Sequence, residues 1–231
     1  CLRTDADHLN ARKLRATGLG QLGRAAEALE ELELVRRLDP LDIHARWHLG
    51  IQPSGGQERL DLVYDLLRSG QNVEANKVLG CSDLTAQDGS VPMILLTLAY
   101  VQDLMGEDGD ATRRLAEAVP LSLCFPSRLE EITMLEHTLA ANPAHSAAQY
   151  LLGNLLYEKR RYEEATDAWE IAARLRPDFP TALRNLGIAR FNVRKDVAGA
   201  LAAYDAAFAA DPESAHAALP SRRVDAGERA P

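Results

Sequence analysis

The sequence has few cysteines, no long apolar run and no excess of positive charge, and each of these absences excludes a class of protein. The three cysteines, Cys1, Cys81 and Cys124, are too sparse and odd in number for a disulfide framework, so we expect a reducing compartment, the cytoplasm. The longest apolar stretch, 93–101, is far shorter than the roughly 18 residues of a membrane span and predicts a buried helix. A net charge of -8 with a pI near 5.3 argues against general nucleic-acid binding.

Sequence motifs of catalysis and metal binding are also missing. The sequence contains no nucleophile elbow, phosphate-binding loop or paired metal-binding cysteines, so we expect no enzymatic activity and no cofactor. Cys124 lies among apolar residues in LSLCFP and is interpreted as a buried structural thiol. His44 and His48 lie four residues apart, a spacing that can begin a metal site, but Ala45 replaces the Glu of the metalloprotease signature. We interpret them as a surface pair and expect no metal.

Two stretches of the sequence share one pattern with a period of 34 residues. The first, 146–177, predicts two amphipathic helices over about 145–159 and 161–175, joined by a tight turn at Arg160 and Arg161. The second stretch follows the same plan with one extra residue in its turn. Two neighbouring helix pairs are therefore predicted in this part of the chain.

Small residues recur where two antiparallel helices must approach closely. In the first stretch they are Gly153 and Ala165, and the large side chain of Trp169 fills the space beside them. Pro177 then ends the second helix. The residues in matching roles of the second stretch are Gly187, Ala200 and Tyr204.

Weaker copies of the helix pair occupy the N-terminal part of the sequence. A first pair is predicted from about residue 8, with its turn at Gly23. HARWHLG begins another first helix, which the Pro and Gly residues of IQPSGGQ break after Gly50. The remaining predictions are pairs beginning near 58 and 91 and a single helix over about 127–141.

These residues resemble the tetratricopeptide repeat, whose pattern has large residues, a Leu-Gly, a later Ala, an aromatic, an Ala and a final Pro. The resemblance implies an all-α fold, a right-handed α-α superhelix of about five helix pairs plus one unpaired helix and a short C-terminal capping helix. We expect a single domain over 1–231. It would hold irregular repeats over 1–142, well-formed repeats over 143–212, and the capping helix and tail over 213–231.

The resemblance also implies where a partner would bind, because the first helices of such repeats line a concave face. Aromatic, amide and guanidinium groups together suit an extended peptide. Packing between repeats is the alternative role for Tyr157 and Phe191. A full carboxylate clamp is not expected, since Asn154 and Arg184 supply only part of its Lys, Asn and Arg set. The implied groove-facing residues are Tyr150, Asn154, Tyr157, Arg184, Ile188, Phe191 and Asn192.

A second resemblance covers most of the chain and concerns its context. The stretches 124–170 and 179–192 resemble the C-terminal helical region of bacterial multidomain proteins in which a carbohydrate-enzyme-like β-sandwich precedes the repeats. Cys1 in place of Met is consistent with a piece of a longer protein, although a mature bacterial lipoprotein would also begin at cysteine. The leading prediction is a scaffold for a protein or peptide partner. The alternatives are an accessory domain of a carbohydrate-active enzyme and a self-association module.

Overall fold

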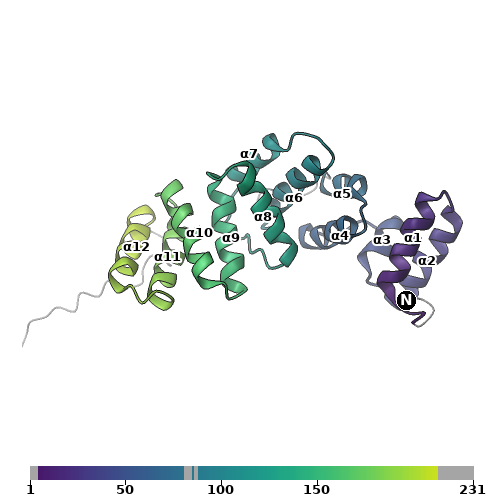
Figure 1. Cartoon of the computed structure of the whole chain (residues 1–231), viewed down its shortest axis with the longest axis horizontal. Helices are drawn as coiled ribbons and strands as arrows, with labels where there is room; N and C mark the ends of the chain where they lie inside the picture. Colours follow the sequence, from purple (N-terminus) through teal and green to yellow (C-terminus); the bar gives the residue numbers. More distant parts are fainter. Residues whose placement is uncertain (1–4, 81–84, 86–87, 213–231) are drawn as a thin grey trace, which may run out of the picture. The chain divides into compact units, whose positions relative to one another are not determined.

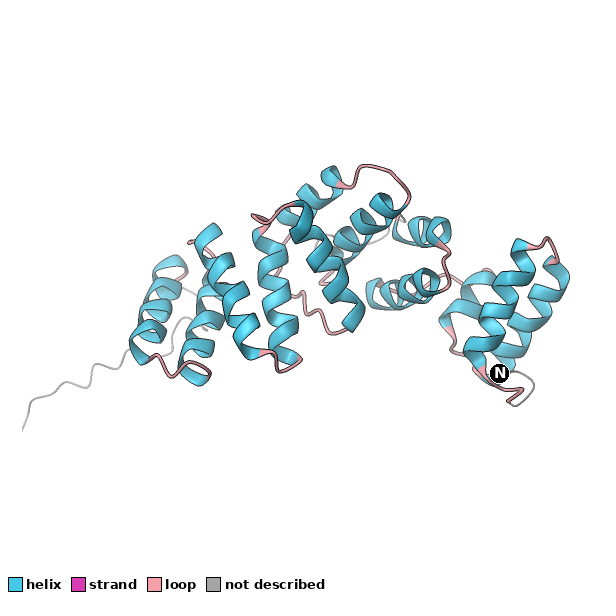
Figure 2. Ribbon diagram, in the orientation of Figure 1, coloured by secondary structure: helices cyan, strands magenta, loops and turns pink. Residues whose placement is uncertain are grey.

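Every regular element that the structure describes is an α-helix (Figure 1, Figure 2). The structure is a computed structural model, and it describes residues 5–80, 85 and 88–212. The predicted all-α helical repeat fold is therefore confirmed. The predicted capping helix and tail lie outside the described residues.

The chain divides into two compact units, Cys1–Ala141 and Asn142–Pro231. This border lies next to the predicted change from irregular to well-formed repeats at residue 142. Whether the two units together form one domain stays a prediction.

The first unit consists of three helix pairs and two single helices. The pairs are α1 with α2, α4 with α5, and α6 with α7, as the sequence predicts, and α8 is the predicted unpaired helix. The broken helix at HARWHLG forms as the short α3, which packs against both α2 and α4. The bounds are α1 Leu9–Gln21, α2 Ala25–Leu38, α3 Ile43–His48, α4 Gly56–Arg68, α5 Asn72–Leu79, α6 Val91–Leu104, α7 Asp110–Ala118 and α8 Leu129–Ala141.

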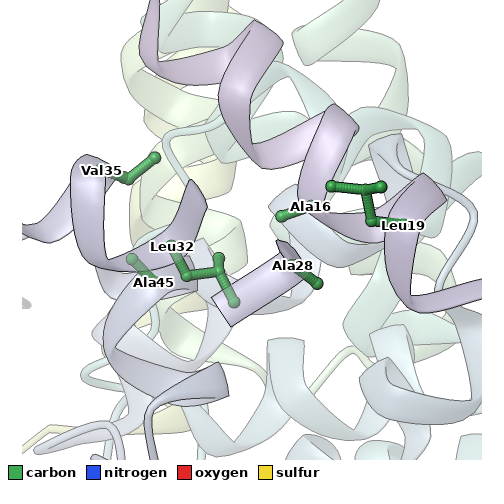
Figure 3. Close-up of a cluster of buried hydrophobic side chains, with 6 residues drawn as sticks. All are labelled: Ala16, Leu19, Ala28, Leu32, Val35 and Ala45. Carbon is green, nitrogen blue, oxygen red and sulfur yellow. The ribbon is translucent and has the colours of Figure 1, made fainter. Parts of the chain in front are cut away.

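Small and aliphatic side chains fill the space between α1, α2 and α3 (Figure 3). Each of the three helices contributes to this cluster, and α2 contributes most because its apolar residues recur every three or four positions along one face. The alanines allow the helices to approach closely. The cluster comprises Ala16, Leu19, Ala28, Leu32, Val35 and Ala45.

The second unit contains two helix pairs, α9 with α10 and α11 with α12. The helix ends agree with the sequence prediction to within a residue or two, since α9 was expected over about 145–159 and α10 over about 161–175. Packing between α10 and α11 joins the two pairs. The bounds are α9 Ser146–Glu158, α10 Tyr162–Leu175, α11 Pro180–Asn192 and α12 Val197–Ala210.

Four of the turns within helix pairs share one geometry. The second residue after the first helix has a positive φ of 74° at Gly23, 72° at Gly70, 79° at Gly106 and 63° at Arg160. In each turn the next backbone N–H donates to the carbonyl five residues earlier, at 2.9 Å. This hydrogen bond satisfies an orphan carbonyl at the helix end and reverses the chain. Arg160 is the one residue of the four with a side chain, so its left-handed conformation carries strain.

Candidate functional site

Glycines mark two close helix contacts in the second unit. A Cβ atom added at Gly153 on α9 would lie 2.5 Å from both Cδ1 and Nε1 of Trp169 on α10. At Gly187 on α11, an added Cβ would lie 2.7 Å from Cε1 of Tyr204 on α12. Both distances are too short for any larger residue to fit without movement. The small residues singled out by the sequence pattern are all buried: Gly153, Ala165, Gly187 and Ala200.

Asn154 joins three successive helices through one oxygen atom. Its Oδ1 accepts hydrogen bonds from Nε1 of Trp169 at 3.1 Å and from Nδ2 of Asn185 at 3.0 Å. Asn154 lies on α9, Trp169 on α10 and Asn185 on α11. The amide oxygen is thus engaged within the unit, which makes Asn154 a weaker candidate for partner contact than its position in the sequence indicated.

Two of the three aromatic residues among the implied groove-facing positions pack within the second unit. Tyr150 is only 4% exposed, and its ring lies 4.6 Å from that of Phe179. The ring of Tyr157 lies 5.2 Å from Trp169 and 4.9 Å from Tyr162. These contacts favour packing roles for both tyrosines.

The other four implied groove-facing residues form one stripe of α11, which we call the α11 stripe: Arg184, Ile188, Phe191 and Asn192. Phe191 is 53% exposed, Asn192 is exposed, and Arg184 and Ile188 are half-buried. Nη2 of Arg184 donates to Oδ1 of Asn185 at 3.3 Å, whereas its Nε is buried without a hydrogen-bond partner among the described residues. A guanidinium with unused donors is suited to binding a carboxylate or a peptide carbonyl.

Ion pairs connect α10 to the C-terminal end of α11 and to the turn that follows α11. Arg194 reaches Glu163 at 3.2 Å, Asp167 at 2.6 Å and Glu170 at 2.9 Å. Arg190 reaches the same Glu170 carboxylate at 2.9 Å. These side chains are partly or largely exposed to solvent, so each pair contributes little alone. Together they fix the orientation of the helix that carries the α11 stripe.

The first unit contains a groove of about 540 Å³, which no sequence motif predicted. We call it the α3 groove. One wall is formed by the C-terminal half of α1 and the N-terminal half of α2. The other wall consists of α3, the turn between α4 and α5, and the first turn of α5. Its volume lies within the usual range of ligand pockets. The lining residues are Ala16, Thr17, Gly20, Gln21, Ala25, Ala28, Leu29, Leu32, His44, His48, Gln71 and Glu74.

His44 and His48 line the α3 groove as uncharged side chains at neutral pH. Burial lowers the pKa of His44 to about 4, assisted by the neighbouring His48, whose ring lies 4.8 Å away. Burial likewise lowers the pKa of His48. The interpretation of a surface pair is wrong for His44, which is 2% exposed because α3 packs between α2 and α4. In the described part of the chain, the pair joins no group of three His, Cys, Asp or Glu side chains that could hold a metal ion.

Asp103 forms a cluster with His137 and Arg113. The Asp–His contact resembles that of a catalytic pair, but the cluster connects three helices. His137 Nε2 lies 2.7 Å from Oδ2 of Asp103, which also accepts a hydrogen bond from Arg113. Although burial opposes it, hydrogen bonds from Arg113 and His137 lower the pKa of Asp103. The carboxylate is thus held ionised by Arg113 between α6, α7 and α8, which indicates a structural role.

Cys124 is buried, as the sequence predicts. Burial, with a smaller contribution from the charge of Glu131, raises the pKa of the thiol to about 12. Because the thiolate is the nucleophilic form, this cysteine is unreactive at neutral pH.

The paired helices and their connecting turns define an all-α helical repeat. Within it, residues 132–170 and 152–215 match the family model described as tetratricopeptide repeat. The match begins within α8 and includes the whole of α9–α12. None of the helices that the structure describes has the length and apolarity needed to cross a membrane.

Several solved structures are similar to this chain at low sequence identity. YrrB, described as a TPR protein with an unusual peptide-binding site, is 14% identical, with 94% of this chain and 93% of that chain covered and a TM-score of 0.37. A crystal structure of MamA is 16% identical, with 85% and 94% covered and a TM-score of 0.37. MamA from Desulfovibrio magneticus RS-1 is 16% identical, with 90% and 97% covered and a TM-score of 0.36.

Proposed function

We propose that this chain is a protein-interaction module that binds an extended peptide along the α11 stripe. The observation that carries the proposal is Arg184, whose half-buried side chain lies on the same helix face as the exposed Phe191. Its Nε is covered by neighbouring atoms, but its terminal guanidinium nitrogens carry four N–H donors, of which Nη2 directs one to Asn185, and this supports a ligand acceptor there. The exposed ring of Phe191 supplies apolar area on the same helix face.

The spacing along α11 defines the ligand that fits. Arg184 and Phe191 are seven residues apart, which corresponds to about 10 Å along a helix. An extended peptide advances about 3.3 Å per residue, so roughly three residues span that distance. The proposed ligand has an acidic side chain or a terminal carboxylate for Arg184 and an apolar side chain about three residues away for Phe191.

Selection from a random peptide library displayed on phage, with the immobilised chain as bait, tests this proposal. We expect enriched peptides to carry an acidic and an apolar residue at that spacing. Binding should weaken at least about tenfold on Arg184→Ala, the cost of one charge-assisted contact, and further on Phe191→Ala. Arg174→Ala is the matched control, because Arg174 is an exposed arginine on α10.

Selected peptides that bind the Arg184→Ala variant as tightly as the unaltered chain would contradict the proposal, because the binding site would then lie away from the α11 stripe. The absence of catalysis, the cytoplasmic location, the β-sandwich context and the accessory-domain and self-association alternatives stay predictions.

A further inference from the structure

A chain of three hydrogen bonds leads from the core of the second unit to Arg184. Nε1 of Trp169 donates to Oδ1 of Asn154 at 3.1 Å, and Nδ2 of Asn185 donates to the same oxygen at 3.0 Å. Oδ1 of Asn185 in turn accepts a hydrogen bond from Nη2 of Arg184 at 3.3 Å. We call these four side chains the amide relay. It connects α9, α10 and α11, and its buried end is Trp169, which is 3% exposed.

The indole at the buried end sets the direction of the amide relay. An indole N–H can only donate, so Asn154 must turn its amide oxygen toward Trp169. That oxygen accepts a second hydrogen bond, which the NH2 group of Asn185 supplies. The oxygen of Asn185 is then left to face Arg184. Reversing the Asn185 amide would bring two oxygens together, so the core fixes a neutral acceptor beside the guanidinium.

This neutral acceptor distinguishes Arg184 from the arginines near it. Arg190, on the same helix, forms an ion pair with Glu170 at 2.9 Å. Arg194, in the turn that follows, forms ion pairs with three carboxylates, and the one with Glu170 is also 2.9 Å long. No carboxylate pairs with Arg184 in the described part of the chain. Because an amide oxygen carries no net charge, Asn185 holds the guanidinium without neutralising it.

The charge of Arg184 acts beyond its own helix. Burial raises the pKa of Tyr204 on α12, and the positive charge of Arg184 opposes that rise. Arg184 itself is half-buried, so water hydrates its charge only in part. A partly buried charge without a counterion costs free energy, and a carboxylate brought by a ligand would recover it.

We propose that Asn185 is the residue that makes the α11 stripe select a carboxylate. Its neutral oxygen holds the guanidinium of Arg184 in place and leaves the positive charge for an anionic group of the ligand. The ligand class is therefore a peptide that carries a carboxylate, and the same peptide with a neutral amide is rejected. Asn185 is a positioning residue, since it acts through Arg184. The inference rests on the proposed peptide binding at the α11 stripe.

The first measurement needs no ligand. Asn185→Asp places a carboxyl group where the amide oxygen faces Arg184, and carbon NMR of the full chain follows the titration of that group. Its pKa should lie at least about one pH unit lower in this variant than in the double variant that also carries Arg184→Ala, because a neighbouring guanidinium favours the ionised form. Equal pKa values in the two variants would show that position 185 does not hold Arg184 and would overturn the proposal.

The second measurement compares short peptides by fluorescence anisotropy. The acidic peptide has an amidated C-terminus and carries Asp and Phe about three residues apart, the spacing that fits α11. Its twin carries Asn in place of Asp. A third peptide has a free terminal carboxylate at the place of the Asp, which distinguishes a terminal carboxylate from a side-chain carboxylate. Preference for either carboxylate over the amide twin, by at least about tenfold, supports the proposal, whereas equal binding of all three peptides overturns it.

Two charged variants show whether position 185 sets that preference. Asn185→Asp should lower the ratio of the acidic peptide's affinity to that of its amide twin from at least about tenfold to about one, because the introduced carboxylate neutralises Arg184. Ala206→Asp is the matched control and should keep the ratio. Ala206 is exposed and lies two residues beyond Tyr204, on the opposite side of α12.

A neutral variant keeps the test decisive if Asn185→Asp unfolds, which circular dichroism and the fluorescence of Trp169 would reveal. Asn185→Ala neither holds nor neutralises the guanidinium. The ratio should therefore stay high, while the acidic peptide binds about threefold more weakly because the Arg184 side chain must be ordered on binding. An unchanged affinity for the acidic peptide would overturn the holding role.

The outcomes separate this inference from the proposed function. If Arg184→Ala weakens binding of the acidic peptide but Asn185→Asp leaves the ratio unchanged, the α11 stripe binds peptides and the role of Asn185 is overturned. If Arg184→Ala leaves binding of the acidic peptide unchanged, the proposed function fails, and the selectivity assigned to Asn185 fails with it.

Discussion

Replacing Gly153 by Ala tests the close contact between α9 and α10 on which the second unit depends. The added Cβ would lie 2.5 Å from two atoms of the Trp169 ring, against about 3.5–4.0 Å for a normal carbon contact. Trp169 is 3% exposed, and its Nε1 donates to Asn154. The ring therefore has no room to move aside and would lose a hydrogen bond by doing so.

Two opposing contributions determine the size of the effect. Ala in place of Gly inside a helix stabilises it by about 1 kcal/mol. Overpacking of a filled core costs about 1–3 kcal/mol, and the rigid Trp169 indicates the upper end of that range. We expect Gly153→Ala to lower the free energy of unfolding of the second unit by about 2 kcal/mol. Gly187→Ala should be close to neutral, because the half-buried Tyr204 ring that it meets can move outward.

The two tryptophans of the chain lie in different units, which allows the second unit to be followed separately. In a Trp47→Phe background, the fluorescence of Trp169 reports urea unfolding of the second unit alone. The matched control is Gly187→Ala in the same background. Linear extrapolation of the two transitions gives the difference in unfolding free energy.

A double-mutant cycle shows whether the cost arises at the proposed contact. Adding Trp169→Phe, followed by circular dichroism, should recover at least about 1 kcal/mol of the Gly153→Ala loss, because the smaller ring leaves space for the methyl group. If Gly153→Ala and Gly187→Ala unfold at the same urea concentration, or if the two changes at 153 and 169 are additive, the close contact does not exist and the packing argument fails.

Three further predictions concern pH, a hydrogen bond and a turn. Because the pKa of His44 falls from 6.5 to about 4 on folding, the unfolded chain binds more protons than the folded chain between these pH values. Lowering the pH from 7.5 to 5 should therefore reduce the unfolding free energy of the first unit by about 2 kcal/mol. Urea titrations of the His44→Gln variant should not show this loss. Asn154→Ala should destabilise the second unit by about 2 kcal/mol, measured through Trp169 fluorescence, since the buried Nε1 loses its acceptor; an unchanged midpoint would contradict the linking role. Arg160→Gly should raise the unfolding free energy by about 0.5–1 kcal/mol by relieving a positive φ of 63°, whereas Lys159→Gly, at φ -78°, should lower it.

The helices could be predicted from the sequence because their signals are local. The ends of α9 and α10 are set by a tight turn, by apolar residues three or four positions apart and by Pro177, all of which lie within one repeat. The close contacts at Gly153 and Gly187 follow from the same spacing, since each glycine of a first helix meets an aromatic residue a fixed number of positions later in the second helix. The break after Gly50 was equally visible as a Pro- and Gly-rich stretch.

The roles of the site residues could not be predicted, because they depend on partners far away in the sequence. Asn154 accepts hydrogen bonds from residues 15 and 31 positions later in the sequence. The sequence pattern of a helix does not distinguish an amide that faces solvent from one that accepts from an indole N–H. The burial of His44 and the α3 groove likewise depend on how α2, α4 and α5 surround a shortened helix. A break in a repeat pattern predicts where a helix ends. Whether the chain itself fills the space beyond that end or leaves a groove depends on how the neighbouring helices pack.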